Sequence, residues 1–555
     1  MTKKQKLELT WVGKENRPRL EPRILLEDAA LSHHAAARGD GDLFDNLLIQ
    51  GDNLLALKAL ETEFSGQVKC VFIDPPYNTG SAFEHYDDGL EHSLWLGMMR
   101  DRLELIRRLL RPDGSLWVTL DDNEAHYFKV MCDEVFGRAN FVAEIAWQKA
   151  FAKKNKAVIS GSHDHVLVYN RDASKWSRNL MPRNEEGRAA FKNPDKDPRG
   201  DWQSVAYSVP SEDGDRRAAY RYDIELPSGR KVGPPSGRHW NGLPERTGLL
   251  REDNRLWFGP KGDSPPRMKV FIEEVQEGVV PDTWWSHDQA GSNQDSKREA
   301  LQLFPGKEPF STAKPEKLLQ RIIHLATNPG DLILDSFAGS GTTGAVAHKM
   351  GRRWIMVELG EHARTHIVPR LNKVIDGQDS GGVTAATGWA GGGGYRFYRL
   401  APSLLEYDKW GREVISKAYN PTMLAEALCK LEGFTHAPSE TEYWNHGHST
   451  EHDFLYVTTQ TLTHERLRDL SEQVGEGRTL LVLCAAYRGD ARSLPNLTVK
   501  KIPDHVRDRC EWGRDVYSLE VDALPPAPVL LGRPAERGKG QGSLSTADLF
   551  EGGDA

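Results

Sequence analysis

Four residues that follow an apolar run have types and an order suited to holding a flat, amine-bearing ring. Asp74, Pro75, Pro76 and Tyr77 come directly after Val68 to Ile73. An Asp carboxylate and the carbonyl of the next Pro can each accept a hydrogen from an exocyclic amine. The prolines restrict the backbone, and the Tyr ring can stack on a base swung out of a duplex. The pattern predicts methyl transfer to the amine of a nucleobase, although a plain turn after a strand uses the same residue types.

A glycine-rich turn supplies a second chemical element. The stretch DLILDSFAGSGTTG, Asp331 to Gly344, is an apolar strand that leads into glycines and then into a helical pattern. Gly339, Gly341 and Gly344 satisfy the spacing G-x-G-x-x-G, which is typical of loops that bind nucleotide cofactors. Glu358 closes the next apolar run, where an acid can bind ribose hydroxyls.

On this segment alone, a nicotinamide oxidoreductase competes with a methyltransferase. Asp335 precedes the glycines, and a carboxylate there suits the cationic methionine moiety of S-adenosylmethionine better than it suits a pyrophosphate. Phe337 and Ala338 separate the strand from the first glycine. A dehydrogenase would also give Asp74 to Tyr77 no role, so the oxidoreductase is the weaker hypothesis.

The order of the two motifs, DPPY first and FAGSG (Phe337 to Gly341) second, resembles the β group of amino-methylating DNA methyltransferases. Longer stretches resemble the modification (Mod) subunits of type III restriction-modification systems, which methylate adenine at N6. They are IQGDNLLALKAL (Ile49 to Leu60), IDPPYNTG (Ile73 to Gly80), DDNEAHYFKVMCDEVFG (Asp121 to Gly137) and KPEKLLQRII (Lys314 to Ile323). The resemblance covers most of residues 1 to 400.

The resemblance implies a role for each matching residue. Asp74, Pro75 and Tyr77 would hold the target amine and base, with Pro76 shaping the turn. The S-adenosylmethionine site would comprise Asp52, Lys314, Pro315, Asp335, Phe337, Gly339, Gly341, Thr342 and Glu358. Within it, Asp52 would lie beside the adenine of the cofactor, Asp335 near its methionine end, Glu358 at the ribose, and Lys314 and Pro315 against the methionine carboxylate. Two simpler readings stay open: Asp52 as a helix N-cap and Lys314 as a solvated charge.

Composition is consistent with a large enzyme. The chain has 555 residues, a length that predicts about three or four domains. Its five cysteines lack the paired spacing of a disulfide framework or a zinc site. The first residues resemble no signal peptide, and no stretch is long and apolar enough to span a bilayer. We therefore expect a cytoplasmic protein that does not contact a membrane.

Basic residues concentrate in the middle of an acidic chain. The net charge is −8, but residues 141 to 270 hold 24 Lys and Arg against 17 Asp and Glu. Five tryptophans are interleaved with them, as on surfaces that contact DNA. In the β group this interval carries the target-recognition domain. The candidate DNA contacts are Trp147, Arg216, Arg217, Arg221, Arg230 and Lys231, although a polar insert with buried tryptophans would show the same composition.

Strand-like and helix-like patterns alternate through the first 140 residues and again after residue 314. Strands are predicted at 68–73, 115–120, 331–334 and 354–357, and helices at 54–64, 94–110, 125–136, 317–327 and 343–350. Pro112-Asp113-Gly114 reads as a turn between a helix and a strand. Alternation of this kind predicts an α/β fold, a Rossmann-like methyltransferase core with both motifs at the carboxyl ends of neighbouring strands.

The chain divides into six predicted parts. They are the first half of the core (1–140), an inserted target-recognition domain (141–309), the second half of the core (310–378), a Gly-rich linker or loop over the core (379–400), a C-terminal α/β interaction domain (401–535) and a disordered tail (536–555).

The sequence therefore predicts a site-specific adenine-N6 DNA methyltransferase that uses S-adenosylmethionine. Its predicted partners are double-stranded DNA, a second copy of the chain and a helicase-nuclease restriction subunit. The alternatives are N4-cytosine methylation, for which related enzymes often have Ser in place of Asp74, and a DNA-recognition subunit in which methyl transfer is secondary. No metal is expected, because His163-Asp164-His165 and the group His446, His448 and His452 lack a known zinc spacing.

Overall fold

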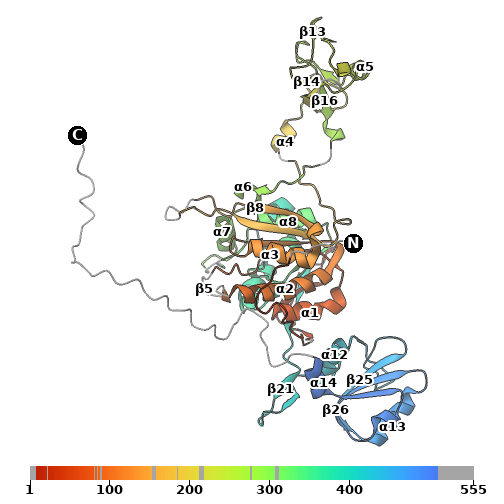
Figure 1. Ribbon diagram of the computed structural model, residues 1–555. Helices are drawn as coiled ribbons and strands as arrows, with labels where there is room; N and C mark the ends of the chain where they lie inside the picture. Colours follow the sequence, from red (N-terminus) through yellow and green to blue (C-terminus); the bar gives the residue numbers. More distant parts are fainter. Residues whose placement is uncertain are drawn as a thin grey trace, which may run out of the picture.

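The chain forms a central α/β body with a smaller lobe at each end of its long axis (Figure 1). The computed structural model describes residues 8–21, 23–79, 82–83, 86–87, 91–152, 158–183, 185–211, 218–275, 278–306, 310 and 312–509. The lobe at the top of Figure 1 comes from the middle of the chain and carries β13, β14, β16 and α5. The lobe at the bottom carries β25, β26 and α12 to α14.

The central body is built on one large mixed sheet. Its strand order is β1 (Leu25–Glu27), β20 (Gly394–Leu400), β3 (Asn46–Gln50), β19 (Arg353–Glu358), β18 (Leu332–Asp335), β4 (Val68–Ile73), β7 (Leu110–Leu120), β9 (Asp164–Asn170), β8 (Phe141–Trp147) and β17 (Trp284–Trp285), while β2 (His33–His34) pairs with β20. The six strands from β20 to β7 run parallel to one another, whereas β9 is antiparallel to β7 and to β8. This arrangement confirms the predicted Rossmann-like fold.

Helices cover both faces of the sheet. On one face α1 (Asn53–Phe64), α2 (His92–Leu109) and α3 (Ala125–Cys132) share a core with Ile73, Val118 and Leu334. On the other, α8 (Glu316–Ala326), α9 (Thr342–Lys349) and α10 (Val368–Ile375) share a core with Phe72 and Ile333. Because neighbouring strand residues point to opposite faces, burial on both sides requires apolar runs without alternation, as in VKCVFI at 68–73.

Pro112-Asp113-Gly114 lies inside β7 and does not separate the helix from the strand. Val68 pairs with Leu110 and Cys70 with Ser115, so residues 111 to 114 bulge out of the ladder. A Cβ at Gly114 would lie 2.9 Å from the carbonyl oxygen of Val68, so this close approach of the two strands requires glycine. The prediction of a turn between the helix and the strand was therefore wrong, because the strand begins at Leu110 and continues across these residues.

The Gly-rich segment after residue 378 packs tightly against the core and ends in β20. Gly391, Gly392 and Gly393 have φ of 102°, 122° and 72°. Added Cβ atoms would lie 2.9 Å from the Ile375 carbonyl oxygen, 2.8 Å from an Asp42 oxygen and 2.6 Å from the Leu43 carbonyl oxygen, respectively. Of the two readings, a linker or a loop over the core, this packing corresponds to the second.

The inserted lobe is a small β-rich unit between residues 183 and 278. Its strands are β10 (Trp202–Ala206), β16 (Arg267–Phe271) and β15 (Leu256–Trp257) in one sheet, with the pairs β11 (Ser208–Pro210) and β14 (Arg238–Trp240), and β12 (Ile224–Glu225) and β13 (Lys231–Val232). Two helices, α4 (Glu185–Ala189) and α5 (Pro244–Glu252), accompany them, and α6 (His287–Ala290) and α7 (Asn293–Leu303) lead back to the core. The first strands of the predicted insert, 141–309, are β8 and β9, and both belong to the main sheet. The inserted lobe therefore begins later than predicted.

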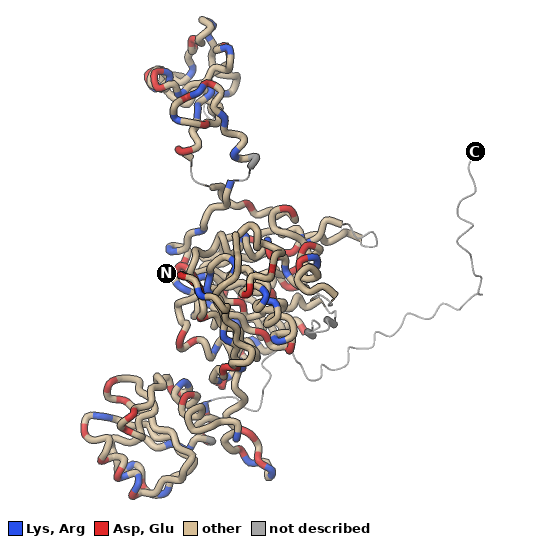
Figure 2. The backbone as a smooth tube through the Cα atoms, turned by 180° about the vertical axis from the view of Figure 1, so that it is seen from behind, with Lys and Arg blue, Asp and Glu red and all other residues tan. Residues whose placement is uncertain are grey.

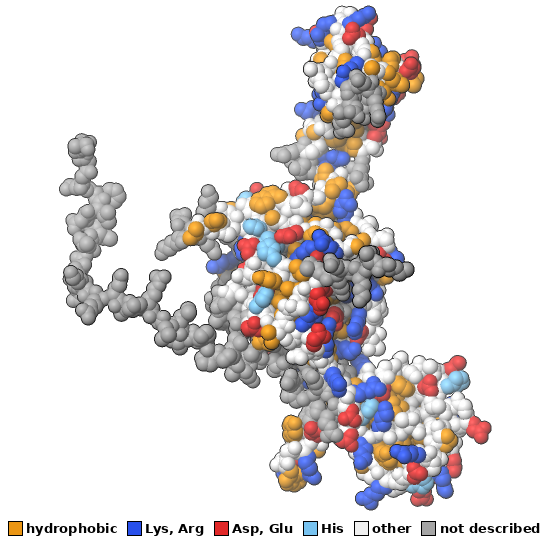
Figure 3. Space-filling view, viewed as in Figure 1, with side chains coloured by type: hydrophobic (Ala, Val, Ile, Leu, Met, Phe, Trp, Pro, Cys, Tyr) orange, Lys and Arg blue, Asp and Glu red, His pale blue; other side chains and the backbone are white. Residues whose placement is uncertain are grey.

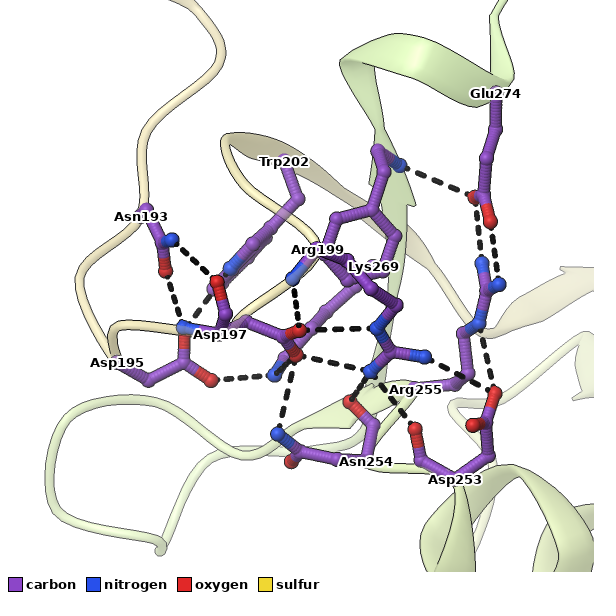
Figure 4. A network of polar contacts seen from close by, with 11 residues as sticks. Asn193, Asp195, Asp197, Arg199, Trp202, Asp253, Asn254, Arg255, Lys269 and Glu274 are labelled. Carbon is purple, nitrogen blue, oxygen red and sulfur yellow. Dashed lines mark hydrogen bonds and ion pairs between the residues drawn. The ribbon is translucent and has the colours of Figure 1, made fainter.

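A charged network helps to hold this lobe together (Figure 4). Lys269 is completely buried and pairs with Asp195 and Asp197, the latter at 3.0 Å. Arg199 bridges Asp197 and Asp253 at 2.9 and 3.1 Å. Hydrogen bonds from Arg199, followed by those from Lys269, hold the pKa of the Asp197 carboxyl below its usual range despite burial. The network joins β16 to the loop before β10.

The C-terminal lobe is a second α/β unit, as predicted for this part of the chain. Its sheet has the order β23 (Thr435–His436), β24 (Gly447–His448), β25 (Asp453–Leu462), β26 (Thr479–Tyr487) and β27 (Leu497–Lys501). Helices α12 (Pro421–Glu432), α13 (His464–Val474) and α14 (Ile502–Arg509) flank it, and the hairpin of β21 (Leu405–Tyr407) and β22 (Glu413–Ile415) precedes it. The predicted tail, 536–555, lies outside the described residues. Among the helices that the structure describes, none has the length and apolar character to cross a bilayer.

Candidate active site at the ends of β4 and β18

Asp74 follows the last residue of β4, and both of its carboxylate oxygens are held. The Thr119 hydroxyl donates to Oδ1 at 2.6 Å, and the Nζ of Lys314 donates to Oδ2. Thr119 lies on β7, next to β4 in the sheet, whereas Lys314 lies just before α8. The carboxylate is therefore fixed in orientation by groups from two different parts of the core.

Lys314 contacts two residues of the DPPY turn. Its ammonium pairs with Asp74 and lies 5.2 Å from the centre of the Tyr77 ring. Only 11% of its side chain is exposed, so the solvated-charge reading is wrong. The predicted contact with the methionine carboxylate stays a prediction, and the contact with Asp74 was missed by the sequence analysis.

The remaining residues of the turn are anchored by neighbouring side chains. The indole Nε1 of Trp95 donates to the Pro76 carbonyl at 2.9 Å. The Tyr77 hydroxyl donates to Oδ2 of Asp164 at 3.4 Å, and Lys149 pairs with Oδ1 of the same carboxylate at 2.5 Å. Burial, followed by the charges of Asp74 and Asp164, raises the pKa of the Tyr77 phenol well above its usual range. The phenol therefore stays protonated, and its ring lies partly buried beside the Asp74 carboxylate.

The glycine loop follows β18, the parallel neighbour of β4. Gly339 and Gly341 have φ of 53° and 75°, and Gly341 is the N-cap of α9. A Cβ at Gly341 would lie 2.7 Å from Cγ2 of Ile367, so both its backbone angle and the space around it favour glycine. Glu358, at the end of β19, accepts hydrogen bonds from the amides of Gly339 at 2.7 Å and Gly360 at 3.1 Å. The Glu358 carboxylate thus holds the glycine loop in place. Its predicted contact with a ribose stays a prediction.

Asp335 is a buried carboxyl between the two motifs. It accepts hydrogen bonds from the Phe337 amide at 2.9 Å and the Thr343 hydroxyl at 2.5 Å. Burial raises the pKa of Asp335 to about 7, and the negative charges of Asp74 and Glu358 contribute to this rise. Phe337 itself is partly buried and packs against the same apolar core as Tyr77. Ionisation of Asp335 is costly beside two further carboxyl groups, so this part of the site is suited to a cationic ligand.

Thr342 and Pro315 belong to the frame around the loop. The Thr342 hydroxyl accepts a hydrogen bond from Arg370 at 2.8 Å, and Arg370 pairs with Glu316 at 2.9 Å. Pro315 is the N-cap of α8, directly before Glu316. Glu316 also pairs with the fully buried Lys349 at 2.8 Å. This buried network ties the start of α9 to the start of α8, and the sequence analysis did not identify Arg370 because its partners are distant in sequence.

Asp52 has the geometry of a helix cap. Its Oδ1 accepts a hydrogen bond from the Leu55 amide at 3.0 Å, and its Oδ2 pairs with buried Arg102 at 3.3 Å. The structure thus shows the N-cap that was the simpler reading. The predicted contact between Asp52 and the adenine of a cofactor stays a prediction.

The predicted DNA contacts fall into three groups. Trp147 is fully buried, and its indole donates to the Gly291 carbonyl at 2.8 Å, so its ring is not available to DNA. Arg216 and Arg217 lie outside the described residues. Arg221, Arg230 and Lys231 are exposed on the inserted lobe, where Figure 2 shows basic and acidic residues along the same backbone.

The tryptophans of the interval are mostly structural. Trp202 and Trp240 are buried, and Trp240 stacks on Tyr207 in the core of the lobe. The interleaving of aromatic and basic residues therefore does not mark a stacking surface. An indole in a small lobe supplies a large apolar surface for its core.

The sheet and the site together define a class of protein. A doubly wound α/β protein with a glycine loop and acidic residues at the carboxyl ends of adjacent strands has the features of a protein that binds a nucleotide-like ligand there. Residues 68–368, more than half of the chain, match the family described as DNA methylase. The chain belongs to this family.

Several known proteins are similar in sequence to much of this chain. The probable type III restriction-modification enzyme HindVI Mod subunit of Haemophilus influenzae is 29% identical over 418 residues, which are 65% of this chain and 55% of that protein. The type III enzyme StyLTI Mod subunit of Salmonella typhimurium is 33% identical over 330 residues, 54% of this chain and 49% of that protein. The type II methyltransferase M.EcaI of Enterobacter cloacae is 30% identical over 337 residues, 59% of this chain and 70% of that protein. The chain thus spans about half the length of the two Mod subunits.

Proposed function

We propose that this protein is a site-specific DNA methyltransferase that transfers a methyl group from S-adenosylmethionine to N6 of an adenine swung out of the duplex. The observation that carries the proposal is the adjacency of β4 and β18, which brings the DPPY turn and the glycine loop to one edge of the sheet. Membership of the DNA methylase family and similarity to Mod subunits support the same reaction.

The acidic residues and the glycine loop at the ends of β18 and β19 fit S-adenosylmethionine. The cofactor supplies, when bound, a methyl group on a positively charged sulfur. Asp335, Glu358 and the loop at Gly339 to Gly341 would hold it, because the acidic groups offset its positive charges and the glycines let the backbone approach closely. Burial and the negative charges of Asp74 and Glu358 raise the pKa of Asp335, so a positively charged ligand beside this carboxyl would favour its ionised form.

The residues of β4 would handle the base. Asp74 and the Pro75 carbonyl accept the amine hydrogens, which directs the nitrogen lone pair towards the methyl group. The Tyr77 ring stacks on the base, and Thr119 keeps the carboxylate in place. The amine proton leaves after the methyl group has arrived, so Asp74 need not be a strong base.

In the structure Thr119 and Lys314 each donate to one oxygen of the Asp74 carboxylate. A carboxylate oxygen can accept more than one hydrogen bond, so Asp74 can accept an amine hydrogen while both donors stay in place. The ammonium and the hydroxyl would therefore keep the carboxylate oriented towards the amine.

We further propose that the chain acts as the modification component of a restriction-modification or related defence system in the cytoplasm. Its partners would be double-stranded DNA, a second copy of the chain and a helicase-nuclease restriction subunit. The similarity to two type III Mod subunits supports this assignment. The inserted lobe, with Arg221, Arg230 and Lys231 exposed, would contact the DNA.

The first test is methyl transfer itself. The purified chain and its Asp74→Ala variant are incubated with labelled S-adenosylmethionine and unmethylated genomic DNA, and the digested nucleosides are identified. We expect N6-methyladenine from the wild type only, with cofactor binding retained in the variant. N4-methylcytosine would favour the cytosine alternative, and binding of cofactor and DNA without transfer would favour a recognition subunit.

A further inference from the structure

Three histidines from two separate segments meet on the central body, outside the active site. The ring centroids of His126 and His165 are 5.5 Å apart, and those of His163 and His165 are 5.2 Å apart. His126 lies on α3, and His165 is the second residue of β9. Figure 3 shows histidine side chains grouped with acidic ones on this body. Asp122, in the turn after β7, completes the cluster.

The donor atoms of this cluster converge. One ligand atom from each of Asp122, His126 and His165 lies within 4.8 Å of the other two. Around a tetrahedral ion with bonds of about 2.0–2.2 Å, ligand atoms are separated by roughly 3.3 Å. Asp122 and His126 are exposed and can adjust, whereas His165 is buried and anchored. Small side-chain movements are therefore enough to close the site.

His165 is oriented in the way that metal-binding histidines usually are. Its Nδ1 lies 2.7 Å from Oε1 of Glu144, and its Nε2 lies 2.8 Å from Oδ1 of Asp122. A carboxylate at one ring nitrogen sets the tautomer and directs the other nitrogen to an ion. Glu144, on the neighbouring strand β8, takes this supporting role.

We propose that Asp122, His126 and His165 bind a divalent transition-metal ion, with Zn²⁺ the best match to two imidazoles and one carboxylate. Three protein ligands leave one coordination position for water or for His163. No metal was expected from the sequence, because neither His163-Asp164-His165 nor the group His446, His448 and His452 has a known zinc spacing. His126 and Asp122 come from other segments, which the fold brings to β9.

The site would couple to the strands that hold the active site. His165 pairs with Leu120 at the end of β7, one residue beyond Thr119, which donates to Asp74. The preceding residue of β9, Asp164, accepts the hydrogen bond of Tyr77. An ion held by Asp122, His126 and His165 would tie the end of β7 and the start of α3 to the start of β9.

A competing account needs no metal. An imidazolium at His165 could bridge Asp122 and Glu144 as an ion network. This network does not use His126, so that residue discriminates between the two accounts. His126 is exposed, and its replacement by Ala should leave the fold intact.

The test uses the full chain after treatment with a chelator. Zn²⁺ binding is followed by calorimetry, and Co²⁺ binding by the visible absorption of its d–d bands. We expect one ion per chain, a higher melting temperature with Zn²⁺, and affinity at least about tenfold weaker in His126→Ala and in Glu144→Gln. His452→Ala, an exposed histidine in the C-terminal lobe, serves as the control and should bind normally.

Two results would overturn the proposal. One is the absence of stoichiometric Zn²⁺ binding to the wild-type chain at micromolar concentrations. The other is binding that His126→Ala leaves unchanged, which would place the ion elsewhere. Neither result depends on methyl transfer, so the metal site and the proposed function are tested separately.

Discussion

The Nζ of Lys314 donates to Oδ2 of Asp74, a residue 240 positions earlier in the chain. This contact joins the segment before α8 to the DPPY turn. It places a cation directly on the carboxylate that should hold the target amine, and Thr119 holds the other oxygen at 2.6 Å. Lys314 is thus a positioning residue for Asp74 in this structure.

Replacing Lys314 by Met should lower kcat by about 100-fold, because the carboxylate loses one of the two groups that orient it. The dissociation constant for S-adenosylmethionine should change much less. Lys314→Arg retains a charged donor and should recover part of the activity. Single-turnover methyl transfer and calorimetry measure the two quantities. Weaker cofactor binding with unchanged kcat would instead place Lys314 at the methionine carboxylate.

The ring of Tyr77 should matter more than its hydroxyl. Tyr77→Ala removes the stacking face and should weaken binding of the flipped base by about 1–3 kcal/mol. Tyr77→Phe loses the hydroxyl, with its 3.4 Å contact to Asp164, but keeps the ring and should retain most activity. The fluorescence of 2-aminopurine at the target position reports base extrusion in each variant. Equal losses in Ala and Phe variants would assign the function to the hydroxyl.

Cofactor binding should strengthen as the pH rises towards 8. Burial raises the pKa of Asp335 to about 7, and a cationic ligand would favour the ionised form. Affinity should therefore fall by up to about tenfold per pH unit below 7. Calorimetry at pH 6, 7 and 8 tests this for the wild type and for Asp335→Asn. Titration of the ligand itself affects both proteins equally, so a pH dependence that persists unchanged in Asp335→Asn would contradict the assignment.

The Asp335 carboxyl also makes the stability of the fold depend on pH. This dependence has the opposite sign to that of cofactor binding, because the stability falls as the pH rises. The folded-state pKa of Asp335, about 7, lies above the ordinary value of 3.8, so the folded protein holds this proton more tightly than the unfolded chain. The stabilising contribution is complete below about pH 4 and is lost as the pH rises to 7. Asp335→Asn should reduce this loss, as measured by urea unfolding without cofactor.

Gly341 and Gly351 form a matched pair for testing the glycine loop. Their φ values are 75° and 70°, so Ala at either position should cost about 1–2 kcal/mol in backbone strain. Only at Gly341 would the new Cβ also contact Ile367, at 2.7 Å, whereas Gly351 has no heavy atom within 4 Å. Thermal unfolding should show the larger loss for Gly341→Ala, and calorimetry should show weakened cofactor binding for that variant alone. Similar cofactor affinity in both variants would separate this loop from the ligand.

Lys269 should be important for the stability of the inserted lobe. Lys269→Met leaves Asp195 and Asp197 without their buried cation and should cost about 3–5 kcal/mol in the free energy of unfolding. Arg230→Met removes an ion pair to Asp263 whose partners are about half exposed, and should lower the free energy of unfolding far less. Urea unfolding followed by tryptophan fluorescence compares the two. Weakened DNA binding in Arg230→Met, without loss of stability, would support its predicted phosphate contact.

Local pattern alone predicted most of the catalytic core. The runs at 68–73 and 354–357 became β4 and β19, and the helical patterns at 54–64 and 317–327 became α1 and α8 within a residue or two. These predictions succeed because a strand buried on both faces is apolar along its whole length, whereas a helix buried on one face has apolar residues at the helical spacing. The two motifs were also expected at neighbouring strand ends, and β4 does pair with β18.

Contacts between distant segments were decided only by the tertiary structure. The sequence gives no sign that Lys314 lies on Asp74 or that Trp147 is buried, because both depend on which surfaces the folded sheet brings together. The glycines at 391 to 393 read as a linker or a loop by composition, yet the space around them requires glycine. Residue types and local periodicity thus determined the sheet and the chemistry at its edge. The fold decided which distant charges and rings complete the site, because packing, and not sequence distance, brings those side chains together.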